Sequence, residues 1–179
     1  MKLPWIVRRV LGIKTMTKVL AGQKAPVFSL PDVAGRVFSL KDALQKGPVF
    51  AAFFKISCPV CQFTFPFFER LYKAYGGKNA TFWGISQDDA RDTKEFCAEY
   101  GVTFPVLLDG EGYPVSNQYG LTNVPTFFLI EPDGTVKVSC VGFGKAEIEQ
   151  IASALAAMQG QKAAPVFLPS EVIPAYKPG

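Results

Sequence analysis

Two cysteines separated by two residues, Cys58 and Cys61, are the residues of this sequence whose type and spacing could do chemistry. They lie in the motif Cys58-Pro59-Val60-Cys61, directly after a nearly continuous apolar run over residues 48–56. Such a run predicts a strand that is buried on both faces. Proline is favoured at the first position of a helix, where its missing N–H would be unpaired anyway. We therefore expect a strand that ends before Cys58, a helix that begins at Pro59, and Cys58 as the N-cap between them.

The N-cap position would make the Cys58 sulfur a nucleophile. An N-cap side chain accepts hydrogen bonds from N–H groups in the first helical turn, here those of Val60 and Cys61. The positive end of the helix also favours a thiolate over a thiol. One turn further on, Cys61 can attack a mixed disulfide formed at Cys58. The spacing predicts Cys58 as the attacking thiolate and Cys61 as the resolving thiol of a disulfide exchange that needs no cofactor.

The same C-x-x-C spacing also occurs in zinc sites, which need four ligands. The chain has no histidine, so the other ligands would have to be Cys97, 36 residues after Cys61, and Cys140, a further 43 residues on. These two do not form a second close pair, and we expect no metal ion. The absence of histidine also excludes Ser-His-Asp and Cys-His nucleophilic sites. We expect Cys97 and Cys140 to be core residues, as free cysteines usually are.

The elements around the motif predict a single α/β domain. A length of 179 residues with 49% hydrophobic residues supports one domain with a sizeable core. Two short apolar runs, at 27–30 and 37–40, predict a β-hairpin. Further strands and helices alternate, which indicates an α/β layer structure. The strands are expected at 48–56, 81–86, 105–108, 126–130 and 135–141, and the helices at 41–46, 59–75, 90–100, 113–119 and 145–158.

The helix that follows the motif has one apolar stripe at helical spacing. Its members are Val60, Phe63, Phe67, Leu71 and Tyr75. Such a stripe predicts the face that packs against the sheet.

The two ends of the chain differ in composition from the domain, which we expect to span residues 25–160. Residues 1–24 contain six basic residues and no acid, so the rest holds 13 of the 19 basic residues and all 15 acids. This nearly neutral body gives no electrostatic reason to expect nucleic acid as a partner. Residues 161–179 contain four prolines, which predicts an extended tail, either packed on the domain or loose.

The basic first segment could form an amphipathic helix on an anionic membrane and make a weak membrane contact. Alternatively, Met16 could begin the protein. The segment has no apolar stretch long enough for a membrane span or an export signal. We therefore expect a cytoplasmic protein, with a location at the membrane periphery or an atypical export signal as alternatives.

Further motifs carry a resemblance to a known superfamily. They are the P-x-F-x-L-x-D pattern at 26–32, Pro66 five residues after the second cysteine, and the segments GVTFPVLLD at 101–109 and YGLTNVPTF at 119–127. With C-P-V-C, they make residues 25–158 resemble the thioredoxin superfamily. The resemblance is to the redoxin branch of TlpA-like thiol–disulfide oxidoreductases, which is related to alkyl hydroperoxide reductase and thiol-specific antioxidant. It implies a thioredoxin-like fold, with a central mixed β-sheet flanked by helices and an N-terminal β-hairpin extension.

The resemblance also implies which residues meet the substrate. Pro125 would be cis and lie against the cysteine pair, and the backbone of Val124 would face an incoming polypeptide. Pro59 and Val60, between the cysteines, complete the expected substrate-binding set. The implied partners are protein disulfides or dithiols and a thiol reductant system, and we expect a monomer.

Three positions depart from the family pattern. Ser57 stands where the family often has Trp, Ala52 where thioredoxins bury an acid, and Thr64 where TlpA-like reductases commonly have Glu. No obvious buried carboxylate therefore remains to take the proton of the resolving thiol. Lys55 and Ser57, next to the first cysteine, could stabilise its thiolate.

Exchange of electrons with cysteine pairs in other proteins is the leading hypothesis, and two others stay open. A peroxiredoxin-type thiol peroxidase would form a sulfenic acid at Cys58 or Cys61, with Cys97 as a resolving cysteine by analogy with some atypical two-cysteine peroxiredoxins. Against it, neither cysteine has the T/S-x-x-C pattern of that family, and residues 124–130 contain no arginine. A non-catalytic module would only hold extended peptides beside Pro125.

The direction of electron flow also stays open. Pro59-Val60 between the cysteines, and Val124 before the proline, resemble oxidising or isomerising relatives. The missing export signal instead favours a reductant.

Overall fold

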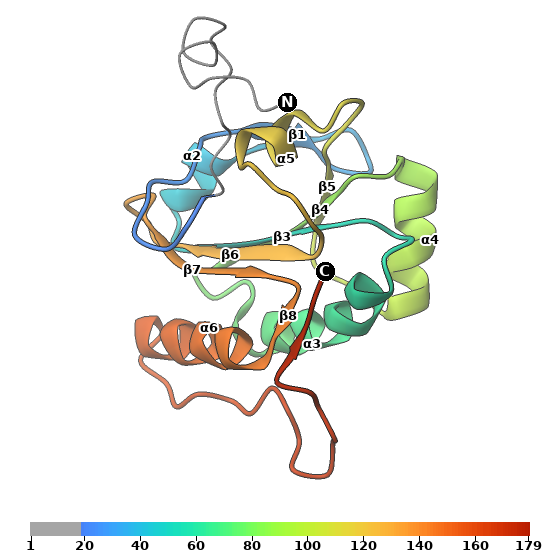
Figure 1. The fold of residues 1–179 in the computed structure, drawn as a ribbon. Helices are drawn as coiled ribbons and strands as arrows, with labels where there is room; N and C mark the ends of the chain where they lie inside the picture. The colour runs from blue at the N-terminus through green and yellow to red at the C-terminus, as the bar shows by residue number, and fades with distance from the viewer. Residues whose placement is uncertain (1–18) are drawn as a thin grey trace, which may run out of the picture.

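The computed structural model of the chain describes residues 19–179, in which strands and helices alternate around one central sheet (Figure 1). The strands are β1 (Ser29–Pro31), β2 (Val37–Ser39), β3 (Val49–Phe54), β4 (Thr81–Ser86), β5 (Val106–Leu108), β6 (Thr126–Ile130), β7 (Val136–Val141), β8 (Phe143–Gly144) and β9 (Tyr176–Lys177). The helices are α2 (Leu40–Leu44), α3 (Pro59–Tyr75), α4 (Ala90–Tyr100), α5 (Pro114–Gln118) and α6 (Lys145–Met158). The expected amphipathic helix and membrane contact fall on residues outside this described part. Within it, no helix is long and apolar enough to cross a membrane.

The central sheet is mixed, with the strand order β5-β4-β3-β6-β7. β3 runs parallel to β4 and antiparallel to β6, and β7 is antiparallel to β6. β3 is the middle strand and is buried along its whole length. Its carboxyl end therefore lies at the centre of one edge of the sheet. This confirms the predicted α/β fold and places the cysteine motif, which follows β3, at that edge.

Alternate residues of β3 divide the interior into two cores. Phe50, Ala52 and Phe54 face a core shared with α3, α4 and α6. Val49, Ala51 and Phe53 face a second core, which the hairpin β1–β2, α2 and α5 cover. Successive side chains of a strand point to opposite faces, so a strand that is apolar at every position can serve both cores. The helices therefore flank the sheet on both sides, as Figure 1 shows.

Helix α3 is buried on more than the predicted stripe. Phe65 and Phe68, outside that stripe, are fully buried against the sheet, whereas Phe63, within it, is only half-buried. The helix also contains Pro66, which has no N–H to donate to the Gln62 carbonyl.

The tail after α6 packs on the domain and ends in a separate two-stranded sheet with β8. Val166 is buried, and the ring of Phe167 lies 5.0 Å from that of Phe67 on α3. Further on, β9 pairs antiparallel with β8. This pairing has no counterpart in the sequence prediction, which left open whether the tail is packed or loose.

Candidate active site

The cysteine motif occupies the junction between β3 and α3, with Cys58 as the N-cap of the helix. The Cys58 sulfur accepts a hydrogen bond from the N–H of Cys61 at 3.3 Å, which confirms the N-cap prediction. The backbone N–H of Cys58 donates to the Lys55 carbonyl at 3.1 Å. A turn at the end of β3 and the first turn of α3 thus fix the position of this sulfur.

The two cysteines differ in exposure, and burial affects the acidity of Cys61. Cys58 is half-buried, whereas Cys61 has no exposed surface. Burial raises the pKa of the Cys61 thiol well above its usual range, and the neighbouring Cys58 and the negative charge of Asp88 raise it further. A backbone hydrogen bond with Lys55 opposes this shift only in part. At neutral pH Cys61 is therefore a protonated, buried thiol, and Cys58 is the more accessible of the two sulfurs.

The loop before β6 brings a third segment to the cysteines. The Val124–Pro125 peptide bond is cis, as the family resemblance implied. The carbonyl oxygen of Val124 lies 3.3 Å from the Cys58 sulfur and accepts its S–H. Within the loop, the Thr126 hydroxyl donates a hydrogen bond to the Asn123 carbonyl at 2.7 Å. The fold thus places a backbone carbonyl, 66 residues away in sequence, directly against the candidate nucleophile.

A carboxylate that the sequence analysis did not identify completes the site. Asp88 follows β4, and its Oδ2 accepts a hydrogen bond from the N–H of Ile56 at 2.8 Å. Asp88 also lines a pocket of about 400 Å³ that opens to solvent. The sequence signal that could have found it is its place two residues after β4, because the carboxyl ends of neighbouring parallel strands meet at one sheet edge.

The other predicted site residues surround the cysteines in different ways. Ser57 and Pro59 are exposed, and Val60 is half-buried. The Lys55 ammonium group lies 5.9 Å from the centroid of the Tyr113 ring. The roles assigned to these residues in substrate binding and in tuning the thiolate stay predictions.

The positions at which the family often has acids hold uncharged, fully buried side chains here. Thr64 donates its hydroxyl to the Val60 carbonyl at 2.5 Å, and Ala52 lies in the middle of β3. Of the remaining cysteines, Cys140 is buried on β7, as predicted for a core residue. Cys97 is half-buried on α4, and burial, with a smaller effect of Glu69, raises its pKa to about 11. In residues 19–179 no group of three or more cysteines, aspartates or glutamates is placed to hold a metal ion.

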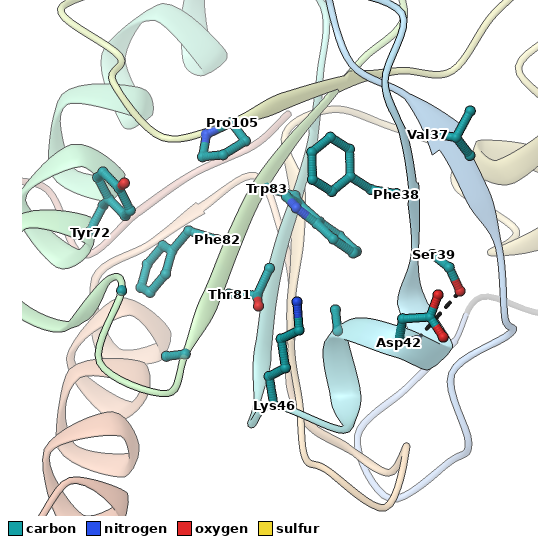
Figure 2. A pocket seen from close by; sticks show the side chains of 13 residues that line it. Val37, Phe38, Ser39, Asp42, Lys46, Tyr72, Thr81, Phe82, Trp83 and Pro105 are labelled. Carbon is teal, nitrogen blue, oxygen red and sulfur yellow. Dashed lines mark hydrogen bonds between the residues drawn. The ribbon is translucent and has the colours of Figure 1, made fainter.

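A second pocket of about 400 Å³ lies away from the cysteines, between β2, α2 and β4 (Figure 2). Figure 2 shows the rings of Phe38 and Trp83 on one side of it and Tyr72 on the other, with Lys46 below Trp83 in this view. No cysteine lines it. This pocket is therefore separate from the cysteine motif.

Similarity to known proteins extends across the whole candidate site. A model of the AhpC/TSA family matches residues 21–139, which include both cysteines and Pro125. The thiol-disulfide oxidoreductase ResA of Bacillus thuringiensis (strain Al Hakam) is 34% identical over 126 residues, which are 70% of this chain and 72% of that protein.

Two solved structures extend this comparison. A structure described as the thiol:disulfide interchange protein DsbE from Chlorobium tepidum is 30% identical, with a TM-score of 0.69, and the match covers 80% of this chain and 100% of that one. The peroxidoxin BcpB from Mycobacterium tuberculosis is 25% identical, with a TM-score of 0.63, and the match covers 79% of this chain and 97% of that one.

Proposed function

Because this chain belongs to the AhpC/TSA family, we propose that it is a thiol–disulfide oxidoreductase in which Cys58 attacks and Cys61 resolves. The observation that carries this assignment is the position of the Cys58 sulfur. It caps α3, accepts from the Cys61 N–H at 3.3 Å and lies 3.3 Å from the Val124 carbonyl. A sulfur at a helix N-terminus is favoured as a thiolate.

The reaction has two exchange steps. The Cys58 thiolate attacks one sulfur of a substrate disulfide, the substrate S–S bond breaks, and the released sulfur takes a proton. Cys61 then loses its proton and attacks the Cys58 sulfur, which frees the second substrate thiol and leaves a Cys58–Cys61 disulfide. The substrate gains two electrons and the protein loses two. The reverse sequence oxidises a substrate dithiol.

The order of attack follows from the difference between the two sulfurs. Cys61 is fully buried and its raised pKa keeps it protonated, so a substrate sulfur meets Cys58 first. Once a mixed disulfide forms at Cys58, the buried thiol lies one helical turn away. The exposed Pro59 and the half-buried Val60, together with Val124 and Pro125, form the surface that meets the polypeptide around the substrate disulfide. A dithiol reductant is the partner that returns the protein to its reduced state.

A thiol peroxidase is the second candidate, because the peroxidoxin BcpB shares this fold at 25% identity. In that reaction the Cys58 thiolate would attack a peroxide oxygen and become a sulfenic acid, with loss of water or an alcohol. Cys61 would then form the disulfide. Consumption of hydrogen peroxide by the reduced protein at a catalytic rate, with no reduction of protein disulfides, would favour this function over disulfide exchange.

Trapping of mixed disulfides tests the proposal directly. Cys61→Ser should accumulate disulfide-linked adducts with reduction-sensitive partners, whereas Cys58→Ser should form none, and Cys97→Ser should behave as the parent. Insulin reduction by the parent tests exchange activity, and a titration against glutathione gives the direction that the couple favours. Equal capture of partners by Cys58→Ser would instead support a peptide-binding module without catalysis.

A further inference from the structure

The segment that ends the described chain lies against the residue that contacts the candidate nucleophile. We call residues 175–179 the strap. Within it, β9 pairs antiparallel with β8, and the Gly179 carbonyl accepts a hydrogen bond from the Asn123 side chain at 3.1 Å. A Cβ atom on Gly179 would lie 2.6 Å from the carbonyl oxygen of Val124. In Figure 1 the red strap rises past α3 and ends at the edge of the sheet where β3 gives way to that helix.

The strap contacts the domain through its backbone, where the N–H of Lys145 donates to the Ala175 carbonyl at 2.9 Å. It also contacts α3 through Lys177, whose ammonium group lies 4.8 Å from the centroid of the Phe63 ring. The corner between β7 and β8 contains Gly142, where a Cβ atom would lie 2.3 Å from the Lys177 carbonyl oxygen. Gly142 also has a φ of +80°, which disfavours other residues. Glycines on both sides of the contact thus allow two backbones to approach more closely than side chains would permit. Such main-chain pairing with an exposed strand is how extended polypeptides commonly bind to a sheet.

The same surface must receive the polypeptide of a protein substrate. The Val124 carbonyl lies 3.3 Å from the Cys58 sulfur, so a substrate cysteine that reaches this sulfur brings its flanking backbone against Val124. The strap already lies against that carbonyl and against β8. An incoming chain and the strap therefore need the same space.

We propose that the strap occupies the docking surface for substrate polypeptide, formed by Val124, Gly142 and β8, and that a protein substrate must displace it. This inference rests on the proposed disulfide exchange. The partner that fits the surface is an extended segment that pairs with β8 and has glycine or another small residue opposite Val124. A small disulfide without a flanking chain reaches Cys58 without displacing the strap.

The structure allows the strap to leave without unfolding of the rest of the tail. β9 has only two residues, and Tyr176 is 55% exposed. Upstream, the tail has a separate attachment, because both Glu171 carboxylate oxygens accept from the Arg70 guanidinium, at 2.6 and 2.8 Å. The Val166 carbonyl accepts from the same guanidinium at 2.8 Å, and its side chain is buried. The contacts of Arg70 with Glu171 and Val166 can therefore stay in place while the strap moves.

Two variants release the strap, and their rates with two disulfides test the proposal. Gly179→Val places side-chain atoms against the Val124 carbonyl, and a chain shortened after Pro174 removes the strap altogether. For Gly179→Val we expect the ratio of the rate constant with insulin to that with hydroxyethyl disulfide to rise roughly two- to tenfold, the effect of losing one hydrogen bond from the closed state. The shortened chain also loses the β8–β9 pairing and the hydrogen bond from the Lys145 N–H to the Ala175 carbonyl, so its ratio should rise at least as much. Val172→Ala changes a fully exposed residue of the same tail and should leave the ratio unchanged. An unchanged or lower ratio in both strap variants would overturn the proposal.

A binding measurement separates this proposal from the proposed function. An insulin B chain with methylated cysteines cannot exchange disulfides, so its affinity, measured by fluorescence anisotropy, does not depend on redox chemistry. Tighter binding to both strap variants than to the parent supports the strap as a competitor, and equal binding contradicts it. Failure of every form to reduce hydroxyethyl disulfide would refute the exchange function alone.

Discussion

Replacement of Asp109 by alanine should weaken both the fold and the candidate site. Asp109 follows β5 and is 1% exposed. Its carboxylate accepts from the N–H groups of Val115 at 3.0 Å and Ser116 at 2.7 Å, and from the Ser116 hydroxyl at 2.6 Å. The N-cap residue of α5, Tyr113, makes no capping hydrogen bond through its side chain. Asp109 therefore does for α5 what an N-cap side chain usually does.

The expected loss of stability follows from these contacts. A hydrogen bond to a charged group contributes about 1.5–3 kcal/mol, but bonds to one group are not additive. We expect Asp109→Ala to lower the free energy of unfolding by about 3–4 kcal/mol. For a chain of this size, 1 kcal/mol shifts the melting temperature by about 2–4 °C, so the decrease should be roughly 6–16 °C.

The effect should reach the site through α5. The Ser116 carbonyl accepts from the N–H of Leu121 at 3.0 Å, at the start of the loop that carries Val124. Loss of this support should lower the rate with protein disulfides as well as the melting temperature. Thermal unfolding followed by circular dichroism, with the exposed Asp42→Ala as control, measures the first effect. A melting temperature of Asp109→Ala within 2 °C of that control, a threshold of about 1 kcal/mol, would refute the assigned role of the carboxylate.

Three further predictions concern acidity. At pH 7 iodoacetamide should label Cys58, the N-cap of α3, and should not label Cys61 or Cys97. The pKa of Cys97 is raised to about 11, so its labelling, read by mass spectrometry, should rise only as the pH approaches that value. Asp88→Asn removes a negative charge that, in addition to burial, raises the pKa of Cys61. The rate at which Cys61 resolves the mixed disulfide, measured by stopped flow at a series of pH values, should therefore rise at lower pH than in the parent. The hydrogen bond from Arg70 lowers the pKa of Glu171 from 4.5 to about 2. The stability this pair contributes is therefore present above pH 4.5 and lost as the pH falls toward 2, and Glu171→Gln should remove that part of the pH dependence.

The core elements could be predicted from sequence because local signals agree with the tertiary structure. The helix expected at 90–100 has the predicted bounds. Asp89 caps its start by accepting from the Asp92 N–H at 2.9 Å. Gly101 ends it with a φ of +66°, a conformation that glycine adopts without the steric cost of a Cβ atom. Strand β6 also has its expected bounds, 126–130, because an apolar run between turn residues defines a buried strand.

The predicted apolar stripe of α3 is confirmed at Phe67, Leu71 and Tyr75, which are buried, but it missed Phe65 and Phe68 for a physical reason. A stripe identifies one buried face, but α3 contacts the sheet on one side and the β8–tail region on another. Phe65 packs against Phe54 of the sheet, with ring centroids 4.3 Å apart. Phe67 instead packs against Phe143 and Phe167, at 5.7 and 5.0 Å. The second contact depends on the path of the tail, which no local pattern in the helix specifies.

The charge beside the resolving thiol comes from a strand edge and not from the helix. Position 64 holds a threonine whose hydroxyl bonds within the helix, so α3 itself places no charge there. The charge of Asp88 acts on Cys61 because β3 and β4 are parallel neighbours and the N–H of Ile56, just beyond β3, holds the Asp88 carboxylate. Burial is the main cause of the raised pKa of Cys61, and the charge of Asp88 raises it further. Thr64→Val removes a hydroxyl but no charge, so it should leave the pH profile of resolution in place, and a shift as large as that of Asp88→Asn would place the controlling group in the helix instead.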